Sequence, residues 1–443
     1  MTEKRRLGSW KEIAAHLGVQ TRTVQRWGKE KGLPVYRAGG GLRARVFAYT
    51  DELDAWLHQH PPETTSVVPP SAAAPDSETS RAIARVSPVA LSIYAAALVV
   101  VIASLLYMGQ RMVLAGQMES AGFVGERLIA RDAEGREVWS YDLAGLMDRP
   151  GRGIWSQRSD LVRLTDLDGD GRREVLAVVH RKEASALSSP SELLCLEGNG
   201  RLRWRYVPQE HLRFGGRDYQ APWYIYDIVV SREPGPRTIW LAVNHNRWWP
   251  SFVVRIDANG RERRQFVNSG SIHKLETMKY RGRSLLLAGG VNNEPYIGAL
   301  AVLDTEQGST VSPQANGSSY RCENCGTGQP LAYFLFSRTE LNKQHDMPLN
   351  FVDEVLFQSD LSVMVTEVYP AASGIYAFDD PVAGPRSFTL TDGYWALHRR
   401  MEAEGVLKHS ADQCHDRSQA RPVRKWTPLQ GWINLSVPAI PMN

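Results

Sequence analysis

The chain has 443 residues, of which 43% are hydrophobic and 23% are charged, and its formal net charge is +4 at pH 7. This length allows two or three domains, and the balance of apolar and charged residues excludes a membrane protein with many spans. The charge is uneven, because residues 1–60 carry 11 Lys and Arg against 6 Asp and Glu, whereas the part after residue 87 is neutral. A small basic segment suggests a polyanionic partner.

Two short helices open the sequence. Ser9-Trp10-Lys11-Glu12 is a capping-box pattern that starts the first helix, and Gly18 supplies the left-handed residue that ends it. After a tight turn, Thr21 caps a second helix that runs to about Lys31 and leaves Arg, Gln and Thr side chains outward. This pair predicts a helix-turn-helix, whose second helix enters the major groove of DNA.

A wing and a third helix complete the domain of residues 1–60. Residues 35–49 predict two short strands around the tip Gly39-Gly40-Gly41, and Thr50 caps the last helix. Arginines on these strands suit the phosphates beside the groove. The alternative is a three-helix domain whose basic residues only face water. The predicted DNA-binding residues are Gln20, Thr21, Arg22, Thr23, Gln25, Arg26, Arg37, Arg43 and Arg45.

Four runs in this domain carry a family resemblance. They are Ser9 to Ala14, Thr23 to Trp27, Val46 to Tyr49 and Leu53 to Trp56. Together they resemble the excisionase-like, winged branch of the MerR-type DNA-binding domains. The resemblance implies transcription control through double-stranded DNA. Gly28 departs from the pattern, because glycine inside a helix costs about 1 kcal/mol relative to alanine.

A linker and an apolar segment follow. Residues 61–85 are rich in Pro, Ser, Thr and Ala and lack periodicity, which predicts a disordered tether. Residues 86–110 contain no Asp, Glu, Lys or Arg, and a helix of their apolar part, 89–108, would cover about 30 Å, the thickness of a bilayer core. This predicts one transmembrane helix, the alternative being a buried helix of a soluble protein. Since a domain that reads DNA lies in the cytoplasm, residues 120–443 are predicted to lie outside the plasma (inner) membrane.

Residues 120–443 contain a repeated hairpin. It occurs as Ile129 to Gly135, Leu194 to Gly200 and Val254 to Gly260, and more loosely as Val302 to Gly308. In the first three copies a carboxylate stands three residues before the glycine, where it can bond its own turn while the glycine takes the positive φ. A second type of hairpin lies between these copies, so a unit of about 60 residues has four strands, the size of one propeller blade.

The repeated unit resembles the FG-GAP-type repeats of integrin-like propellers, and its hairpins look like the blades of quinoprotein-type propellers. The predicted fold of residues 120–443 is an all-β propeller of about five degenerate four-stranded blades. The fold class predicted for the whole chain is therefore multidomain: a small α+β winged helix-turn-helix, a single transmembrane α-helix and an all-β propeller.

An acidic loop lies in the first hairpin of the second type. Its alternate positions would place five oxygen donors around a hard cation, with glycines allowing the chain to wrap closely. Carboxylates so close together repel one another unless a cation joins them, which predicts one structural calcium ion; the alternative is a plain acidic turn. The predicted ligands are Asp166, Asp168, Asp170, the carbonyl oxygen of Arg172, and Glu174.

The four cysteines all lie after residue 120. Cys322 and Cys325 have the spacing of a small disulfide, of a redox pair or of half a zinc site, and a place outside the cytoplasm favours the disulfide. Cys414-His415 could add two zinc ligands if these residues lay nearby. Residues 394–404 predict a late helix with no catalytic constellation around it.

No glycine-rich phosphate loop, nucleophile elbow or paired-metal histidine pattern occurs in the sequence, which predicts that the chain is not an enzyme. Together the parts predict a bacterial, single-pass, membrane-anchored transcriptional regulator. Its outer propeller would sense an unidentified extracytoplasmic ligand or protein, and a homodimer is one expected assembly. One alternative is an envelope adhesion or scaffold protein whose cytoplasmic domain binds protein. Another is a quinoprotein-type propeller enzyme.

Overall fold

The computed structural model describes residues 6–38, 45–59, 118–144, 161–180, 191–232, 236–245, 249–345 and 347–440. The chain forms two compact units, residues 1–90 and 91–443, and each is described by itself.

The predicted linker, 61–85, and the predicted membrane span, 86–110, lie outside the described residues. In the ranges that are described, no helix has both the length and the apolar character needed to cross a membrane. The predicted single-pass location in the plasma membrane finds no such helix among the described residues, and it is not carried further.

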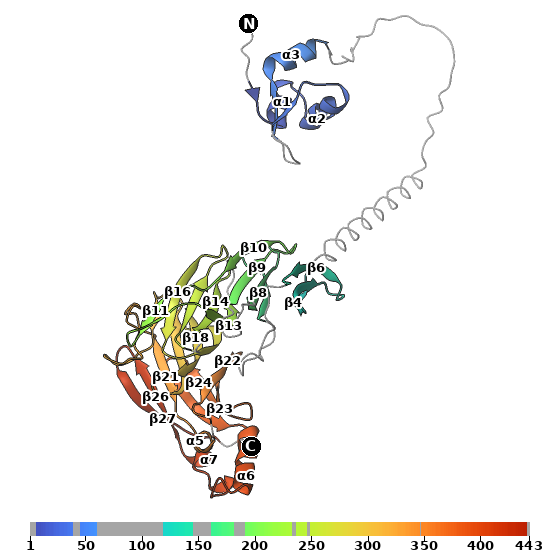
Figure 1. Cartoon of the computed structure of the whole chain (residues 1–443). Coiled ribbons are helices and arrows are strands. Elements are labelled where there is room, and N and C mark those ends of the chain that lie inside the picture. Colours follow the sequence, from blue (N-terminus) through green and yellow to red (C-terminus); the bar gives the residue numbers. More distant parts are fainter. Residues whose placement is uncertain are drawn as a thin grey trace, which may run out of the picture. The chain divides into compact units, whose positions relative to one another are not determined.

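The first unit is a small α+β fold (Figure 1). Its elements in chain order are β1 (Arg6–Leu7), α1 (Trp10–His16), α2 (Thr21–Glu30), β2 (Tyr36–Ala38), β3 (Arg45–Tyr49) and α3 (Thr50–Gln59). β3 is the middle strand of an antiparallel sheet with β1 and β2. Ile13, Val24 and Leu53, one from each helix, are fully buried at the centre of the core.

The start of α1 follows the capping pattern of the sequence. The Ser9 hydroxyl accepts a hydrogen bond from the Glu12 backbone N–H at 3.2 Å, and the Glu12 carboxylate accepts one from the Gly8 N–H at 2.8 Å. The structure also gives a reason for the glycine inside α2. A Cβ atom at Gly28 would lie 3.3 Å from the Trp10 ring, so glycine lets α1 and α2 approach closely.

The second unit is mostly β (Figure 1), with five sheets of three or more strands among the described residues. The first sheet comprises β4 (Ser120–Val124), β5 (Arg127–Arg131) and β6 (Glu137–Asp142). The second comprises β7 (Val162–Thr165), β8 (Glu174–His180), β9 (Ser191–Leu196) and β10 (Leu202–Tyr206). The third comprises β13 (Trp223–Val230), β14 (Ile239–His245), β15 (Ser251–Ile256), β16 (Glu262–Asn268) and β20 (Thr310–Val311).

The remaining sheets combine neighbouring and distant segments. The fourth comprises β17 (Ile272–Tyr280), β18 (Arg283–Asn292), β19 (Ile297–Asp304), β21 (Ala332–Phe336), β26 (Arg421–Thr427) and β27 (Gly431–Val437). The fifth comprises β22 (Phe351–Phe357), β23 (Leu361–Val368), β24 (Ala372–Asp380) and β25 (Gly384–Leu390). A separate hairpin pairs β11 (Leu212–Phe214) with β12 (Arg217–Tyr219). All pairings between the strands of the described residues are antiparallel except the one between β16 and β20.

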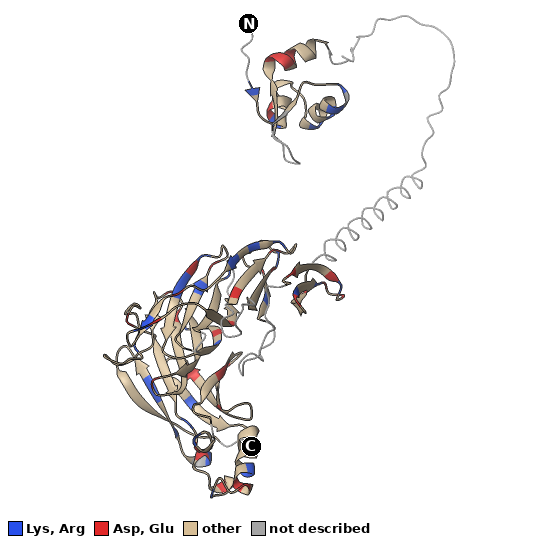
Figure 2. Ribbon diagram, viewed as in Figure 1, with Lys and Arg blue, Asp and Glu red and all other residues tan. Residues whose placement is uncertain are grey.

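The prediction of a largely β second part is confirmed at this coarse level. The sheets do not share the predicted four-strand composition, because they have three, four, five, six and four strands. The six-stranded sheet gains β26 and β27 from the end of the chain. Acidic and basic residues are interspersed along the strands of this unit (Figure 2), in keeping with its neutral charge.

Two of the repeated hairpins form their turns as expected, whereas in the hairpin of Gly200 the Glu197 carboxylate accepts from the Arg201 side chain. The Asp132 carboxylate accepts hydrogen bonds from the backbone N–H groups of Glu134 and Arg136 at 3.1 and 2.9 Å. The carboxylate of Asp257 bonds the corresponding amides of its own turn. The turn glycines Gly135, Gly200 and Gly260 have φ values of 79°, 80° and 80°.

Successive hairpins also contact one another through a tryptophan. The Trp139 indole N–H donates to the Gly198 carbonyl at 3.1 Å, and the Trp204 indole N–H donates to the Ala258 carbonyl at 3.0 Å. A Cβ atom at Gly200 would lie 2.8 Å from the Trp139 ring. Each tryptophan therefore packs on the turn of the next hairpin and joins one sheet to its successor.

Four helical elements lie together at the end of the unit near β23 and β24 (Figure 1). They are α5 (Glu340–Gln344), α6 (Asp392–Ala403), the 3-10 helix η1 (Ala411–Gln413) and α7 (His415–Ser418). α5 connects β21 to β22, and the other three connect β25 to β26. Residues about 70 positions apart are thus brought to one place.

Candidate metal centre

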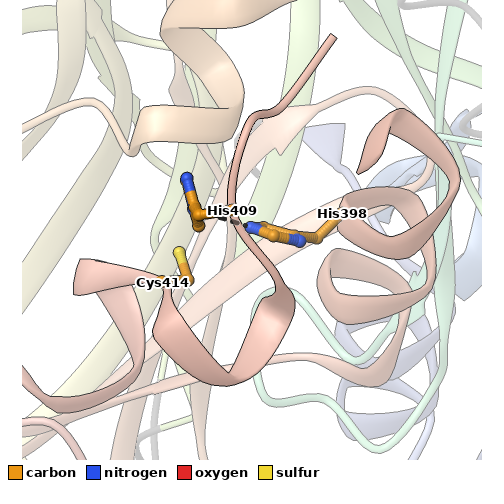
Figure 3. A group of neighbouring side chains, drawn as sticks. All are labelled: His398, His409 and Cys414. Carbon is orange, nitrogen blue, oxygen red and sulfur yellow. Dashed lines mark hydrogen bonds between the residues drawn. The ribbon is translucent and has the colours of Figure 1, made fainter. Parts of the chain in front are cut away.

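Three possible metal ligands meet between α6 and α7 (Figure 3). His398, His409 and Cys414 each offer one ligand atom, and these atoms lie within 4.8 Å of one another. The Nε2 atoms of His398 and His409 are 3.3 Å apart. His398 and Cys414 are 1% and 2% exposed, so two of the three ligands lie inside the protein.

Glu340 on α5 completes the group as a fourth donor. Its Oε2 atom lies 3.5 Å from His409 Nε2 and 3.9 Å from Cys414 Sγ. Tetrahedral zinc with ordinary Zn–N, Zn–O and Zn–S bonds has edges of about 3.3 to 3.6 Å between its ligand atoms. These separations and the 3.3 Å between the two histidines are close to the edges of a tetrahedral metal site.

Burial governs the protonation of these groups. It lowers the pKa of His398, as does the neighbouring imidazole of His409, so the neutral ring that a metal requires is favoured. Burial raises the pKa of the Cys414 thiol to about 11, so the thiol is protonated at neutral pH in the absence of a nearby cation. In the described part of the chain, the buried Nδ1 atom of His398 has no hydrogen-bond partner. A bound metal ion would supply the nearby positive charge that stabilises the Cys414 thiolate.

A buried polar network holds the ligand-bearing elements in place. The Asp416 carboxylate accepts hydrogen bonds from the Glu340 backbone N–H at 2.9 Å and from the Tyr394 hydroxyl at 2.7 Å. It also accepts one from the guanidinium of Arg421 on β26. One carboxylate thus joins α5, α6, α7 and the fourth sheet, and it fixes Glu340 relative to Cys414.

The sequence identified only part of this centre. Residues 394–404 are predicted to form a helix with no catalytic group around it, whereas α6 carries the possible metal ligand His398 on its buried face. Three histidines and one cysteine fall within 18 residues, at positions 398, 409, 414 and 415. This density of possible ligands was the feature of the sequence that could have indicated a metal site. Glu340 gave no signal, because it lies 74 positions before Cys414.

Cys414 lies apart from the Cys-x-x-Cys pair. The structure places a disulfide between Cys322 and Cys325, with a Cα–Cα distance of 5.6 Å. The loop that carries this disulfide binds the β11–β12 hairpin, since the Asn324 side chain accepts from the Arg213 N–H at 2.9 Å and donates to the His211 carbonyl at 2.9 Å. The combination of Cys322, Cys325 and Cys414-His415 as one zinc site is therefore excluded.

The acidic loop between β7 and β8 pairs with a positively charged side chain from β10. The Arg203 guanidinium lies 2.8 Å from the Asp168 carboxylate and 3.6 Å from that of Glu174. The Asp166 carboxylate accepts from the N–H groups of Gly169 and Gly171 at 2.8 and 3.0 Å, and Asp170 accepts from the Arg172 N–H at 2.8 Å. Asp166, Asp168 and Glu174 do lie together.

The prediction of structural calcium is nevertheless corrected. Its premise was that clustered carboxylates need a metal cation, and the Arg203 side chain already supplies positive charge at Asp168 and Glu174. The backbone amides of the turn take up the carboxylates of Asp166 and Asp170.

The residues predicted to contact DNA are only partly described. Gln20, Thr21, Arg22, Gln25 and Arg26 are exposed at the start and along one side of α2, and Thr23 is half-buried. Arg37 and Arg45 belong to β2 and β3, and Arg43 lies outside the described residues. No contact in the structure tests a role for these side chains.

Comparisons with known proteins give distant likenesses only. No family model and no curated protein matches the chain. Among solved structures, a chimera of apocarotenoid oxygenase and RPE65 shares 12% identity over 58% of this chain and 67% of its own, with a TM-score of 0.23. A mutant of the Synechocystis apocarotenoid oxygenase shares 13% identity over 60% of this chain and 69% of its own, again with a TM-score of 0.23.

These findings correct the predicted identity and function. The reported structures are named as oxygenases, and none is a DNA-binding protein or a membrane-anchored regulator. The prediction of a winged helix-turn-helix regulator with an FG-GAP-like propeller is contradicted. The predicted partners, which are double-stranded DNA, membrane and an outer ligand, are contradicted as well. So is the prediction that the chain is not an enzyme. At this identity and TM-score, no substrate or cofactor is carried over to this chain.

Proposed function

We propose that the β-rich unit binds one transition-metal ion at His398, His409 and Cys414. The observation that carries the proposal is the convergence of two imidazoles and one thiol within 4.8 Å at a largely buried place. Imidazole and thiolate together suit zinc, and they also accept copper or iron. Glu340 is the fourth donor in this proposal, because its carboxylate lies within 4 Å of both His409 and Cys414.

Metal removal should destabilise the β-rich unit. An ion that binds only the folded state adds about 2.7 kcal/mol to the free energy of unfolding when its free concentration is 100 times its Kd. We expect the purified full chain to contain about one metal ion per molecule by elemental analysis, and a chelator to lower the melting temperature of its β-rich unit in calorimetry.

Matched variants test the ligands. His398→Ala and Cys414→Ser should lose the ion, whereas His211→Ala, an exposed histidine paired with Asp218 in the same unit, should retain it. A chain purified without metal, whose melting temperature does not respond to added zinc, copper or iron, would contradict the proposal.

A second candidate function is metal-assisted hydrolysis. The observation that favours it is the position of Glu340, whose Oε2 atom lies 3.5 to 3.9 Å from its described neighbours and whose side chain is 30% exposed. A carboxylate that is close to the metal position without being tightly held can leave the fourth position to water and then accept its proton. The unit would in that case be an enzyme.

Glu340→Gln separates the two roles. If Glu340 is a ligand of a closed site, the substitution should weaken metal binding by about tenfold or more, measured by competition with a chromogenic chelator. If Glu340 is the base of an open site, metal binding should be unchanged, while the pH profile for hydrolysis of an activated ester should lose its dependence on this carboxylate. Unchanged metal binding together with an unchanged pH profile would exclude both roles.

We also propose that the successive sheets are blades of a β-propeller. The first strands of the third, fourth and fifth sheets, β13, β17 and β22, contact one another in order, as inner strands of neighbouring blades do. The tryptophan contacts between hairpins support the same arrangement, because they join consecutive sheets at their outer turns. A propeller of about five blades is the count that five sheets support.

A further inference from the structure

The disulfide between Cys322 and Cys325 lies in a segment with little regular structure. Between β20 and β21, residues 312–331 are all described, and they form no helix or strand beyond isolated bridge pairings. Long segments of this kind inside a compact unit are uncommon and often functional. Both cysteines of the disulfide are only half-buried, whereas the two free cysteines of the chain are buried. The disulfide is therefore within reach of a reagent in solvent.

The two residues between these cysteines bind the β11–β12 hairpin. The Glu323 backbone N–H donates to the Arg213 carbonyl at 2.8 Å, and the Asn324 side chain accepts from the Arg213 N–H at 2.9 Å. The Asn324 side chain also donates to the His211 carbonyl at 2.9 Å. The Glu323 carboxylate accepts from the Gly216 N–H at 2.6 Å and lies 3.2 Å from Arg213 Nε. The disulfide loop, residues 322–325, thus holds the backbone of the hairpin.

The hairpin in turn covers part of the apolar core. Leu212, Phe214 and Tyr219 are 0%, 2% and 8% exposed, and they belong to one buried cluster with Trp223. The rings of Phe214 and Tyr219 lie 5.7 and 5.4 Å from the ring of Trp249. Movement of the hairpin away from the unit would therefore bring apolar and aromatic surface into contact with water.

The hairpin depends on contacts from outside itself. In the described chain, β11 and β12 form a two-stranded sheet of their own, and such a hairpin is at best marginally stable alone in water. The disulfide restricts the conformations of the loop that binds it. Without the disulfide, the loop would lose more conformational entropy when it orders against the hairpin, so its hold would weaken.

We propose that the Cys322–Cys325 disulfide is a redox site whose reduction by a dithiol releases the β11–β12 hairpin. A thiolate of the dithiol attacks one sulfur of the disulfide, which forms a mixed disulfide and frees the other cysteine as a thiolate that takes up a proton. The second thiol of the reagent then displaces the remaining cysteine, which receives its proton. The reagent is thereby oxidised to a disulfide, and both protein cysteines become thiols.

Hydrogen exchange followed by mass spectrometry tests the release. The oxidised full chain is compared with the same chain treated with dithiothreitol, and alkylation confirms that both cysteines have become thiols. After reduction, we expect the amides of residues 211–219 and 322–325 to exchange faster by about tenfold or more, because they lose the hydrogen bonds between loop and hairpin. The hairpin of β26 and β27, which belongs to another sheet, should exchange at an unchanged rate.

Variants separate the disulfide from other effects of the reagent. Dithiothreitol also binds metal ions, so the double variant Cys322→Ser, Cys325→Ser tests the same point without a reductant. Its hairpin amides should exchange fast with or without dithiothreitol. Asn324→Ala should speed their exchange while the disulfide stays intact, since it removes two of the hydrogen bonds to the hairpin. Asn259→Ala, at an exposed asparagine in the turn of another hairpin, should leave them unchanged.

Three results would overturn the proposal. One is unchanged exchange of the hairpin amides after complete reduction. Another is faster exchange spread evenly over the β-rich unit, because the disulfide would then stabilise the unit as a whole. The third is a disulfide that dithiothreitol does not reduce in the folded chain. The metal content of the double variant is expected to equal that of the unchanged chain, so this proposal and the metal centre can fail separately.

Discussion

Gly200→Ala is expected to lower the free energy of unfolding of the β-rich unit by about 2 to 5 kcal/mol. A left-handed backbone costs a residue with a Cβ atom about 1 to 2 kcal/mol, and overpacking adds about 1 to 3 kcal/mol. Both penalties apply, since Gly200 has a φ of 80° and its added Cβ would lie 2.8 Å from the Trp139 ring. Denaturant unfolding of the full chain, followed by fluorescence and far-ultraviolet circular dichroism, measures the loss.

Gly135→Ala is the matched control for this substitution. Gly135 occupies the same place in the preceding hairpin with a φ of 79°, but no atom of the described residues lies within 4 Å of its added Cβ. It should lose only the backbone part, about 1 to 2 kcal/mol. Trp139→Ala should then make Gly200→Ala cost no more than Gly135→Ala. Equal losses for Gly200→Ala and Gly135→Ala in the unchanged background would show that the tryptophan contact does not join the sheets.

Arg421→Met is expected to destabilise the same unit by about 3 to 5 kcal/mol, the usual cost of removing one partner from a buried ion pair. Arg421 is 6% exposed and Asp416 is 7% exposed, and the Arg421 guanidinium also donates to the Ser337 carbonyl at 2.9 Å. The substitution leaves the Asp416 carboxylate buried without its cation. Arg424→Met is the control, because Arg424 is exposed on the same strand and lies over the Trp432 ring, a contact worth about 1 kcal/mol or less.

The loss caused by Arg421→Met should depend on pH. Burial raises the pKa of Glu367, and the positive charge of Arg421 opposes that rise. Without Arg421 the folded-state pKa of Glu367 rises further above its unfolded-state pKa. The variant therefore loses more folding free energy as pH increases through this range and Glu367 must ionise. We therefore expect a larger difference in unfolding free energy at pH 8 than at pH 5. A difference that is constant over this range would mean that Glu367 does not respond to Arg421.

The sequence predicted the structures that depend only on interactions between neighbouring residues. Ser9 and Glu12 start α1 as expected, because a cap needs only partners within one turn. The carboxylate and glycine of the hairpins at Asp132 and Asp257 form the expected turn for the same reason. The period of about 60 residues was enough to predict a largely β second part, since each copy repeats one local pattern.

Tertiary structure decided the contacts that join distant segments. It brings Glu340 to Cys414 across 74 positions, and it places Arg203 against Asp168 across 35 positions. The second of these contacts removes the argument for calcium, which treated the acidic loop as if only its own residues were present.

By itself, then, the sequence determined where helices and hairpins begin and turn, because those choices depend on hydrogen bonds within a few residues. The candidate metal centre and the packing of Trp139 on Gly200 were decided only by the fold. Each of them requires side chains from separate elements to meet, and the free energy of such contacts arises from burial and charge pairing that a local pattern does not contain.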